Sequence, residues 1–226
     1  MAPIITTKNL NRDFYSGGET IHALKNINIS IEQGKLTILR GRSGSGKTTL
    51  LNLISALDMP TSGNIYFENK DITQLSQKKR DEFRRTQIGI IFQSVALISL
   101  MSAYENVEFA LRIAGYDARK RRKRAEECLT MVGLGKRMGH RPHEMSGGEQ
   151  QRVAIARAIS HEPKVVFADE PTAELDTTMS LHIVKLFKDL VQNHGITVVM
   201  TTHDPSMVDI ADRVITLEDG VVIDEH

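Results

Sequence analysis

The chain has 226 residues, of which 40% are hydrophobic and 25% charged, so it can bury a substantial core within one domain. Its 29 lysines and arginines almost balance its 28 aspartates and glutamates. The net charge of +1 gives no overall field that would attract nucleic acid, so we expect no nucleic-acid partner. No apolar run approaches the roughly 20 residues that span a bilayer, and residues 1–10 lack the pattern of a signal peptide. We therefore expect any membrane role to come through a partner protein. The single cysteine, Cys128, fits a reducing compartment.

Short β-branched segments alternate with helical patterns along most of the chain. Residues 26–31 alternate polar and apolar side chains, which predicts a half-buried strand, and residues 35–40 predict a second strand. Further strands are predicted over residues 64–67, 88–92, 165–168 and 197–200, and helices over residues 48–57, 178–193 and 205–211. This alternation predicts an α/β fold whose largely parallel sheet is covered on both faces.

Residues 94–160 have a different pattern, with apolar residues at helical spacing, dense charge and little proline. We predict that they form a helical sub-domain inserted into a core made of residues 1–93 and 161–226, all within one domain that covers residues 1–226. Six consecutive basic residues, 119–124, are predicted to form a solvated helix face. Contact with anionic lipid is the alternative for this run.

A glycine-rich segment follows the strand predicted at residues 35–40. Residues 41–48, GRSGSGKT, match the phosphate-binding pattern G-x-x-x-x-G-K-[ST] in full, between a strand and a helix. Backbone N–H groups of such a loop cradle phosphates, and the helix start adds a favourable dipole. Lys47 is predicted to reach the β- and γ-phosphates and Thr48 to ligate Mg²⁺. The candidate nucleotide-binding residues are Gly41, Ser43, Gly44, Ser45, Gly46, Lys47, Thr48 and Thr49.

The strand predicted at residues 165–168 ends in two carboxylates. Asp169 is predicted to hold the Mg²⁺ shell, and Glu170 is placed to polarise an attacking water. An acidic strand end that simply leads into a turn is the alternative, and the phosphate loop in the same chain weakens it.

A second candidate anion site begins at Ser146. Ser146 and Glu149 form an S-x-x-E capping box that predicts the start of a helix. A helix that begins with Ser-Gly-Gly also presents free N–H groups and a positive dipole end. One chain thus carries two phosphate-binding devices, and one nucleotide need not use both from the same chain.

In type and order these motifs resemble the ATP-binding-cassette (ABC) ATPases of transporters. The resemblance rests on the phosphate loop, Gln93, residues 146–149, Asp169 with Glu170, residues 173–176 and His203. It implies a P-loop NTPase (RecA-like) core with an N-terminal antiparallel β region, and ATP and Mg²⁺ as ligands. It also implies a head-to-tail dimer of two copies. Each ATP then lies between one chain's phosphate loop and the other chain's Ser146, Gly147, Gly148 and Glu149.

The same resemblance assigns roles to single residues. Gln93 is similar to the glutamine that senses Mg²⁺ and the attacking water, and it joins Thr48 and Asp169 as an implied metal ligand. His203 resembles the switch histidine that contacts the γ-phosphate. Asp176 resembles the aspartate that links the two sites across the interface. Phe14 fits the aromatic residue that stacks on adenine, with a place at the edge of the core as the alternative.

Within the family, residues 57–63, 90–93, 105–107 and 146–158 resemble the group of lipoprotein-release, macrolide-export and peptide-resistance exporters. That group implies a separate integral membrane permease, docked between residues 94 and 109, which holds the chain at the cytoplasmic face of the cell membrane. Such systems often transmit force across the membrane. A cell-division ATPase that regulates a membrane partner without transport is the alternative.

Overall fold

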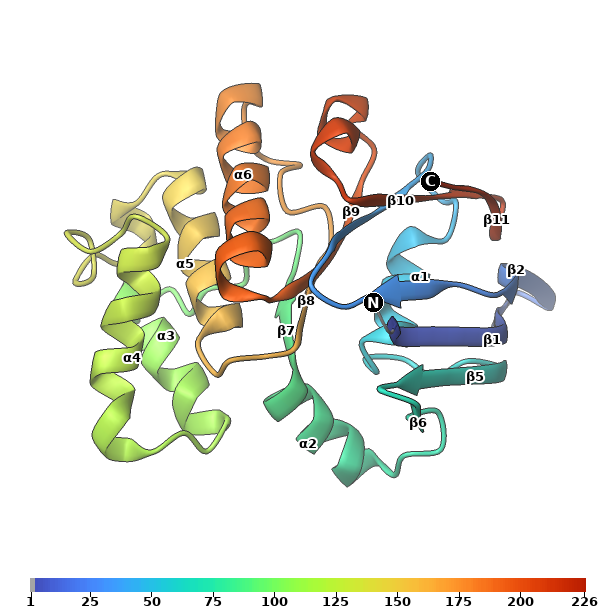
Figure 1. Cartoon of the computed structure of the whole chain (residues 1–226), viewed down its shortest axis with the longest axis horizontal. Helices are drawn as coiled ribbons and strands as arrows, with labels where there is room; N and C mark the ends of the chain where they lie inside the picture. The colour runs from blue at the N-terminus through green and yellow to red at the C-terminus, as the bar shows by residue number, and fades with distance from the viewer. Residues whose placement is uncertain (1–2) are drawn as a thin grey trace.

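The computed structural model describes residues 3–226, except the side chains of residues 205 and 206, and it contains two β-sheets with covering helices (Figure 1). The larger sheet has six strands in the order β11-β10-β4-β9-β8-β7. All neighbours from β10 to β7 are parallel, and only β11 runs antiparallel to β10. The largely parallel sheet is therefore confirmed. Its strands are β4 (Leu36–Arg40), β7 (Ile88–Ile91), β8 (Val165–Ala168), β9 (Thr197–Thr202), β10 (Arg213–Glu218) and β11 (Val221–Glu225).

The second sheet confirms the predicted N-terminal antiparallel β region. Its order is β2-β1-β5-β6, with β3 also paired to β1, and each of these pairs is antiparallel. The strands are β1 (Pro3–Ser16), β2 (Glu19–Ile27), β3 (Ser30–Glu32), β5 (Ser62–Phe67) and β6 (Lys70–Asp71).

The single strand predicted over residues 26–31 is wrong, because β2 ends at Ile27 and β3 begins only at Ser30. The Thr7 hydroxyl interrupts the ladder between them, donating to the Ile27 carbonyl at 2.9 Å and accepting from the Ile29 N–H at 3.0 Å. Ile27, Ile29 and Ile31 are nevertheless all buried. The alternation in the sequence therefore predicted correctly which side chains are buried, but it did not predict the break in the strand.

The helices cover both faces of the larger sheet. They are α1 (Lys47–Ile54), α2 (Gln77–Gln87), α3 (Ala103–Ile113), α4 (Ala118–Met131), α5 (Gly147–Ile159) and α6 (Thr177–His194), with short 3₁₀ helices η1 (Pro142–Glu144) and η2 (Pro205–Ile210). The helix predicted over residues 178–193 is confirmed as α6, which ends at Gly195 in the left-handed conformation. The helix predicted over residues 48–57 is shorter, because Ala56 has a φ of 57°. The predicted helix at residues 205–211 is 3₁₀ instead of α.

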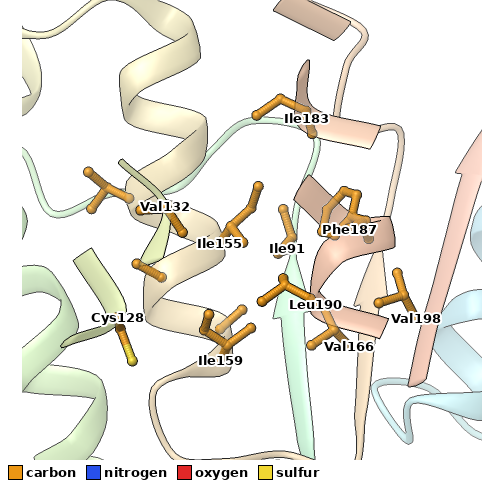
Figure 2. Close-up of a cluster of buried hydrophobic side chains, with 14 of the residues drawn as sticks. Ile91, Cys128, Val132, Ile155, Ile159, Val166, Ile183, Phe187, Leu190 and Val198 are labelled. Atoms are coloured by element: carbon orange, nitrogen blue, oxygen red, sulfur yellow. The ribbon is translucent and has the colours of Figure 1, made fainter. Parts of the chain in front are cut away.

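Two hydrophobic clusters form the core, one on each face of the larger sheet. Val166 faces the cluster shared with α3 to α6 (Figure 2), and its neighbour Phe167 faces the cluster shared with α1 and the second sheet. This alternation gives the two covered faces that the sequence predicted.

The first cluster runs without a break from Ile91 and Val166 in the sheet to Ile155 in α5. The division of the chain at residues 94 and 160 therefore stays a prediction.

The basic run at residues 119–124 is only partly a solvated face. Lys123 is 85% exposed, as predicted, whereas Arg124 is 16% exposed. Arg124 donates from Nε to the Ser160 carbonyl at 2.9 Å and from Nη2 to the Ile159 carbonyl at 3.2 Å. The prediction is wrong for Arg124, because its guanidinium caps the end of α5.

Across the described residues, no helix combines the length and apolarity needed to cross a bilayer.

Cys128 should not react with alkylating agents while the protein is folded. Its side chain is fully buried in the first cluster, and burial raises the pKa of the thiol to about 11. The thiolate is the reactive species, so both access and charge state oppose reaction. Iodoacetamide at pH 8 should leave native protein unmodified over hours and alkylate it fully in guanidinium chloride, as read by mass spectrometry. Rapid native labelling would contradict the packing of α4.

Candidate functional site

The glycine-rich loop links β4 to α1 and is held by close backbone contacts. A Cβ atom at Gly41 would lie 2.3 Å from the Leu217 carbonyl oxygen, and one at Gly46 would lie 2.8 Å from the Ala23 carbonyl oxygen. Gly46 also has a φ of 102°, which side chains rarely adopt. Glycine is therefore required at both positions, where the loop wedges against β10 and β2.

A cavity of about 340 Å³ opens above this loop. Its lining combines loop residues with two side chains that the sequence placed at the same site, Gln93 and Glu170. The Lys47 side chain is buried, and its Nζ donates to the Gly41 and Arg42 carbonyls, at 2.9 Å each. The other lining residues are Ala23, Ser43, Gly44, Gly46, Thr48 and Thr49. Gly41 and Ser45 do not line the cavity. The part of all these residues in nucleotide binding stays a prediction.

Asp169 lies between two hydroxyl groups. Its Oδ1 accepts from Thr48 Oγ1 at 3.0 Å and from Thr201 Oγ1 at 2.7 Å. The same Thr201 oxygen accepts from the Glu170 N–H at 2.7 Å. Sequence reasoning missed Thr201. It lies beside Asp169 because β8 and β9 pair in parallel with Ala168 opposite Met200, which no local motif reveals.

Glu170 and His203, which the sequence singled out separately, lie side by side. His203 Nδ1 lies 3.4 Å from Glu170 Oε2, and the histidine side chain is 63% exposed. Glu170 has a φ of 42°, a left-handed conformation that is uncommon outside glycine and is concentrated at functional sites. Both residues line a second cavity of about 160 Å³, beside Thr172 and Ser180.

The capping box at the start of α5 is confirmed. Ser146 Oγ accepts from the Glu149 N–H at 3.3 Å, and the Ser146 N–H donates to Glu149 Oε2 at 2.9 Å. This backbone hydrogen bond lowers the pKa of Glu149. Asp176 caps α6 by accepting from the Met179 N–H at 2.9 Å. A Cβ atom at Gly148 would lie 2.5 Å from the terminal methyl group of Met179, which is the flexible end of that side chain.

Asp169, Asp176 and His203 do not line the Lys47 cavity, and neither do two further predicted site elements. The first is the α5 start, because none of residues 146–149 contributes to that cavity's lining. The second is Phe14 on β1, whose ring carries the Arg12 guanidinium 4.4 Å from its centroid. Phe14 is 39% exposed, which argues against a place in the core. Its role as the adenine platform stays a prediction.

The order and geometry of these motifs agree with a comparison against known families. The model of the ABC transporter family matches residues 24–173, well over half of the chain. The chain belongs to the ABC transporter family. It is an ATP-binding protein of that family and an ATPase, and its fold is that of the ABC ATPase cassettes.

Relatives cover the chain from end to end. An uncharacterised ABC transporter ATP-binding protein of Methanocaldococcus jannaschii is 43% identical over 98% of each chain. The ATP-binding cassette MJ0796 of the same organism, solved as a dimer in a post-hydrolysis state bound to ADP and Pi, is 42% identical. It superposes with a TM-score of 0.90 over 98% of this chain and 97% of that one. Macrolide export ATP-binding/permease protein MacB 2 of Yersinia pestis is 41% identical over 97% of this chain, which spans 32% of MacB 2.

Proposed function

We propose that this ABC ATPase drives a separate membrane permease through an ATP-dependent, head-to-tail dimer of two copies. One observation carries the proposal. Among the described residues, the Ser146 helix start does not line the cavity of the Lys47 loop, although both features are of the kind that binds anions. A partner copy would bring its Ser146, Gly147, Gly148 and Glu149 to the phosphates held by Lys47. A relative 42% identical to this chain has been solved as a dimer, which supports the arrangement.

The residues around Asp169 fit Mg²⁺ bound with ATP. Thr48 Oγ1 and Asp169 Oδ1 lie 3.0 Å apart and supply the hard oxygen ligands that this cation prefers. Gln93 lines the Lys47 cavity together with Thr48, and it completes the predicted set of metal ligands. When bound, the ion would neutralise charge on the phosphates. Thr201 would hold the Asp169 carboxylate in place for it.

Hydrolysis needs a base beside the γ-phosphate, and we propose Glu170 for that role. Its backbone is fixed by the hydrogen bond to Thr201, and its carboxylate lies beside His203. We assign Glu170 to accept the proton of the attacking water and His203 to contact the γ-phosphate. Asp176, at the start of α6, would contact the partner copy, and Phe14 would stack on the adenine ring.

The permease is proposed to dock on the segment between residues 94 and 109. Ile98, Leu100 and Phe109 are exposed there, and Leu100 is 79% exposed. A group of exposed apolar side chains of this kind marks interfaces. The MacB 2 relative is named as both ATP-binding protein and permease, and this chain matches 32% of it. We therefore propose an export or mechanotransmission system, related to lipoprotein, macrolide or peptide exporters, at the cytoplasmic face of the membrane.

A cysteine at Leu100 should cross-link to the membrane partner in native membranes. Cys128 is buried, so Leu100→Cys would present the reactive thiol. Mass spectrometry of the cross-linked product should identify a permease with few transmembrane helices. Asp219→Cys, in the turn between β10 and β11, is the control and should not cross-link. Cross-linking from Asp219→Cys with none from Leu100→Cys would contradict the docking site.

A further inference from the structure

The backbone directly after Gln93 is strained. Val95 has a φ of 38° and Ala96 a φ of 49°, and the Ala96 N–H donates to the Ser94 carbonyl to close a tight turn. A left-handed conformation is costly for any residue with a side chain, and for a β-branched residue such as valine it is a genuine outlier. Such a conformation persists only where the surroundings enforce it.

A single arginine from α5 enforces this turn. Arg157, in the last turn of α5, donates from Nη1 to the Ala96 carbonyl at 2.5 Å and from Nη2 to the Val95 carbonyl at 3.2 Å. Burial lowers the pKa of Arg157. Placing a guanidinium in such a site is unfavourable unless its hydrogen bonds compensate. The two carbonyls therefore account for its position.

The rest of the segment is anchored from α3. The buried Asn106 accepts from the Ile98 N–H at 2.9 Å and donates to the Ile98 and Met101 carbonyls at 3.2 and 3.1 Å. The chain between Gln93 and α3 is thus fixed to two helices. Of the bonds to the two helices, those to Arg157 lie nearer to Gln93 along the chain than those to Asn106.

We propose that Arg157 is a positioning residue for ATP hydrolysis, which holds the Val95 and Ala96 carbonyls so that Gln93 is fixed in the cavity of Lys47 and Glu170. This inference rests on the proposed role of Gln93 and deepens it. Arg157 lies near one end of α5 and Ser146 at the other, about 17 Å away at the usual helical rise. One helix, α5, therefore connects two parts of the proposed mechanism. Its start, at Ser146, would contact the ATP of the partner copy, and its end, at Arg157, holds the segment that follows Gln93 of the same chain.

The test compares two arginines that are matched in chemistry. Arg157→Lys keeps the charge and most of the side chain but cannot donate to both carbonyls from one planar fork. Arg124→Lys is the control, because Arg124 also donates to two backbone carbonyls, those of Ile159 and Ser160, without touching the segment after Gln93. Melting temperatures of both variants measure the structural loss separately from catalysis.

Phosphate release by the purified full chain should separate the two variants. We expect Arg157→Lys to lower kcat between about 10- and 100-fold, through displacement of a reacting group, while KM for ATP stays within about twofold. Arg124→Lys should keep kcat within about twofold of the wild type, on the same reasoning. In a double-mutant cycle, Arg157→Lys should lower kcat little further once Gln93→Ala is present, because both act through one side chain.

Two outcomes would overturn the proposal. One is an Arg157→Lys kcat equal to that of Arg124→Lys. The other is a double variant whose fold-loss of kcat equals the product of the fold-losses of Arg157→Lys and Gln93→Ala, because the two side chains would then act independently. A Gln93→Ala protein that hydrolyses ATP at the wild-type rate would instead contradict the proposed role of Gln93. An Arg157→Lys protein with reduced kcat in that situation would show that Arg157 acts on another group, which also rejects the positioning of Gln93.

Discussion

Lys47→Ala should abolish tight binding of ATP. Of the residues that line the 340 Å³ cavity in the described chain, Lys47 is the one cation, and its buried Nζ lies against the phosphate-loop carbonyls. Loss of one partner from a buried, hydrogen-bonded charge pair costs about 3 kcal/mol or more, which corresponds to at least about a 100-fold loss of affinity. Titration with a fluorescent ATP analogue, in the presence of Mg²⁺, measures this change directly.

The exposed Lys123→Ala is the control for the loss of one positive charge. It should bind ATP as the wild type does and should gain the same increase in melting temperature when ATP is added. Lys47→Ala should gain no such increase. An unchanged dissociation constant for Lys47→Ala would show that residues 41–48 do not hold the phosphates.

Glu170→Gln should nearly stop hydrolysis while leaving ATP binding intact. The amide has almost the shape of the carboxylate, and it leaves Lys47 and Thr48 in place, but it cannot accept the proton of the attacking water. Loss of a general base lowers turnover by about 10²- to 10⁴-fold. Phosphate release at saturating ATP measures turnover, and the fluorescent analogue measures affinity.

Glu174→Gln is the matched control for this variant. Glu174 is exposed and lies in the same connection between β8 and α6, and it lines neither of the two cavities at the site. It should hydrolyse ATP at close to the wild-type rate. Equal losses of turnover in the two variants would indicate a general effect of acidic charge and would reject Glu170 as the base.

Local signals in the sequence predicted the parts of the fold that depend on neighbouring residues. The phosphate loop, the capping box of Ser146 and the helix α6 each follow from residue types within one or two turns of chain. α2 was not predicted, because only Phe83 is buried along it and no apolar period is visible. The break between β2 and β3 depends on Thr7, a residue distant in sequence.

The candidate site divides in the same way. Lys47, Gln93 and Glu170 belong to recognisable motifs, and the fold brings them to one cavity. No local motif predicts which residues Thr201 and Arg157 contact. The first is placed by the register of two parallel strands, and the second by how α5 packs beside the segment after Gln93. Such contacts follow from topology, which a single sequence does not display.

The molar mass of Glu170→Gln in solution, measured by light scattering with ATP and with ADP, tests the proposed ATP-bridged dimer most directly. The chain should be a monomer with ADP, and ATP should double its mass, because the γ-phosphate would bridge Lys47 of one copy and the Ser146 helix start of the other. Adding Ser146→Arg to Glu170→Gln should return the mass with ATP to that of the monomer, since the larger side chain occupies the space of the opposing phosphate. A Glu170→Gln protein that remains a monomer at saturating ATP, or an ATP dimer that survives Ser146→Arg, would contradict the proposed mechanism.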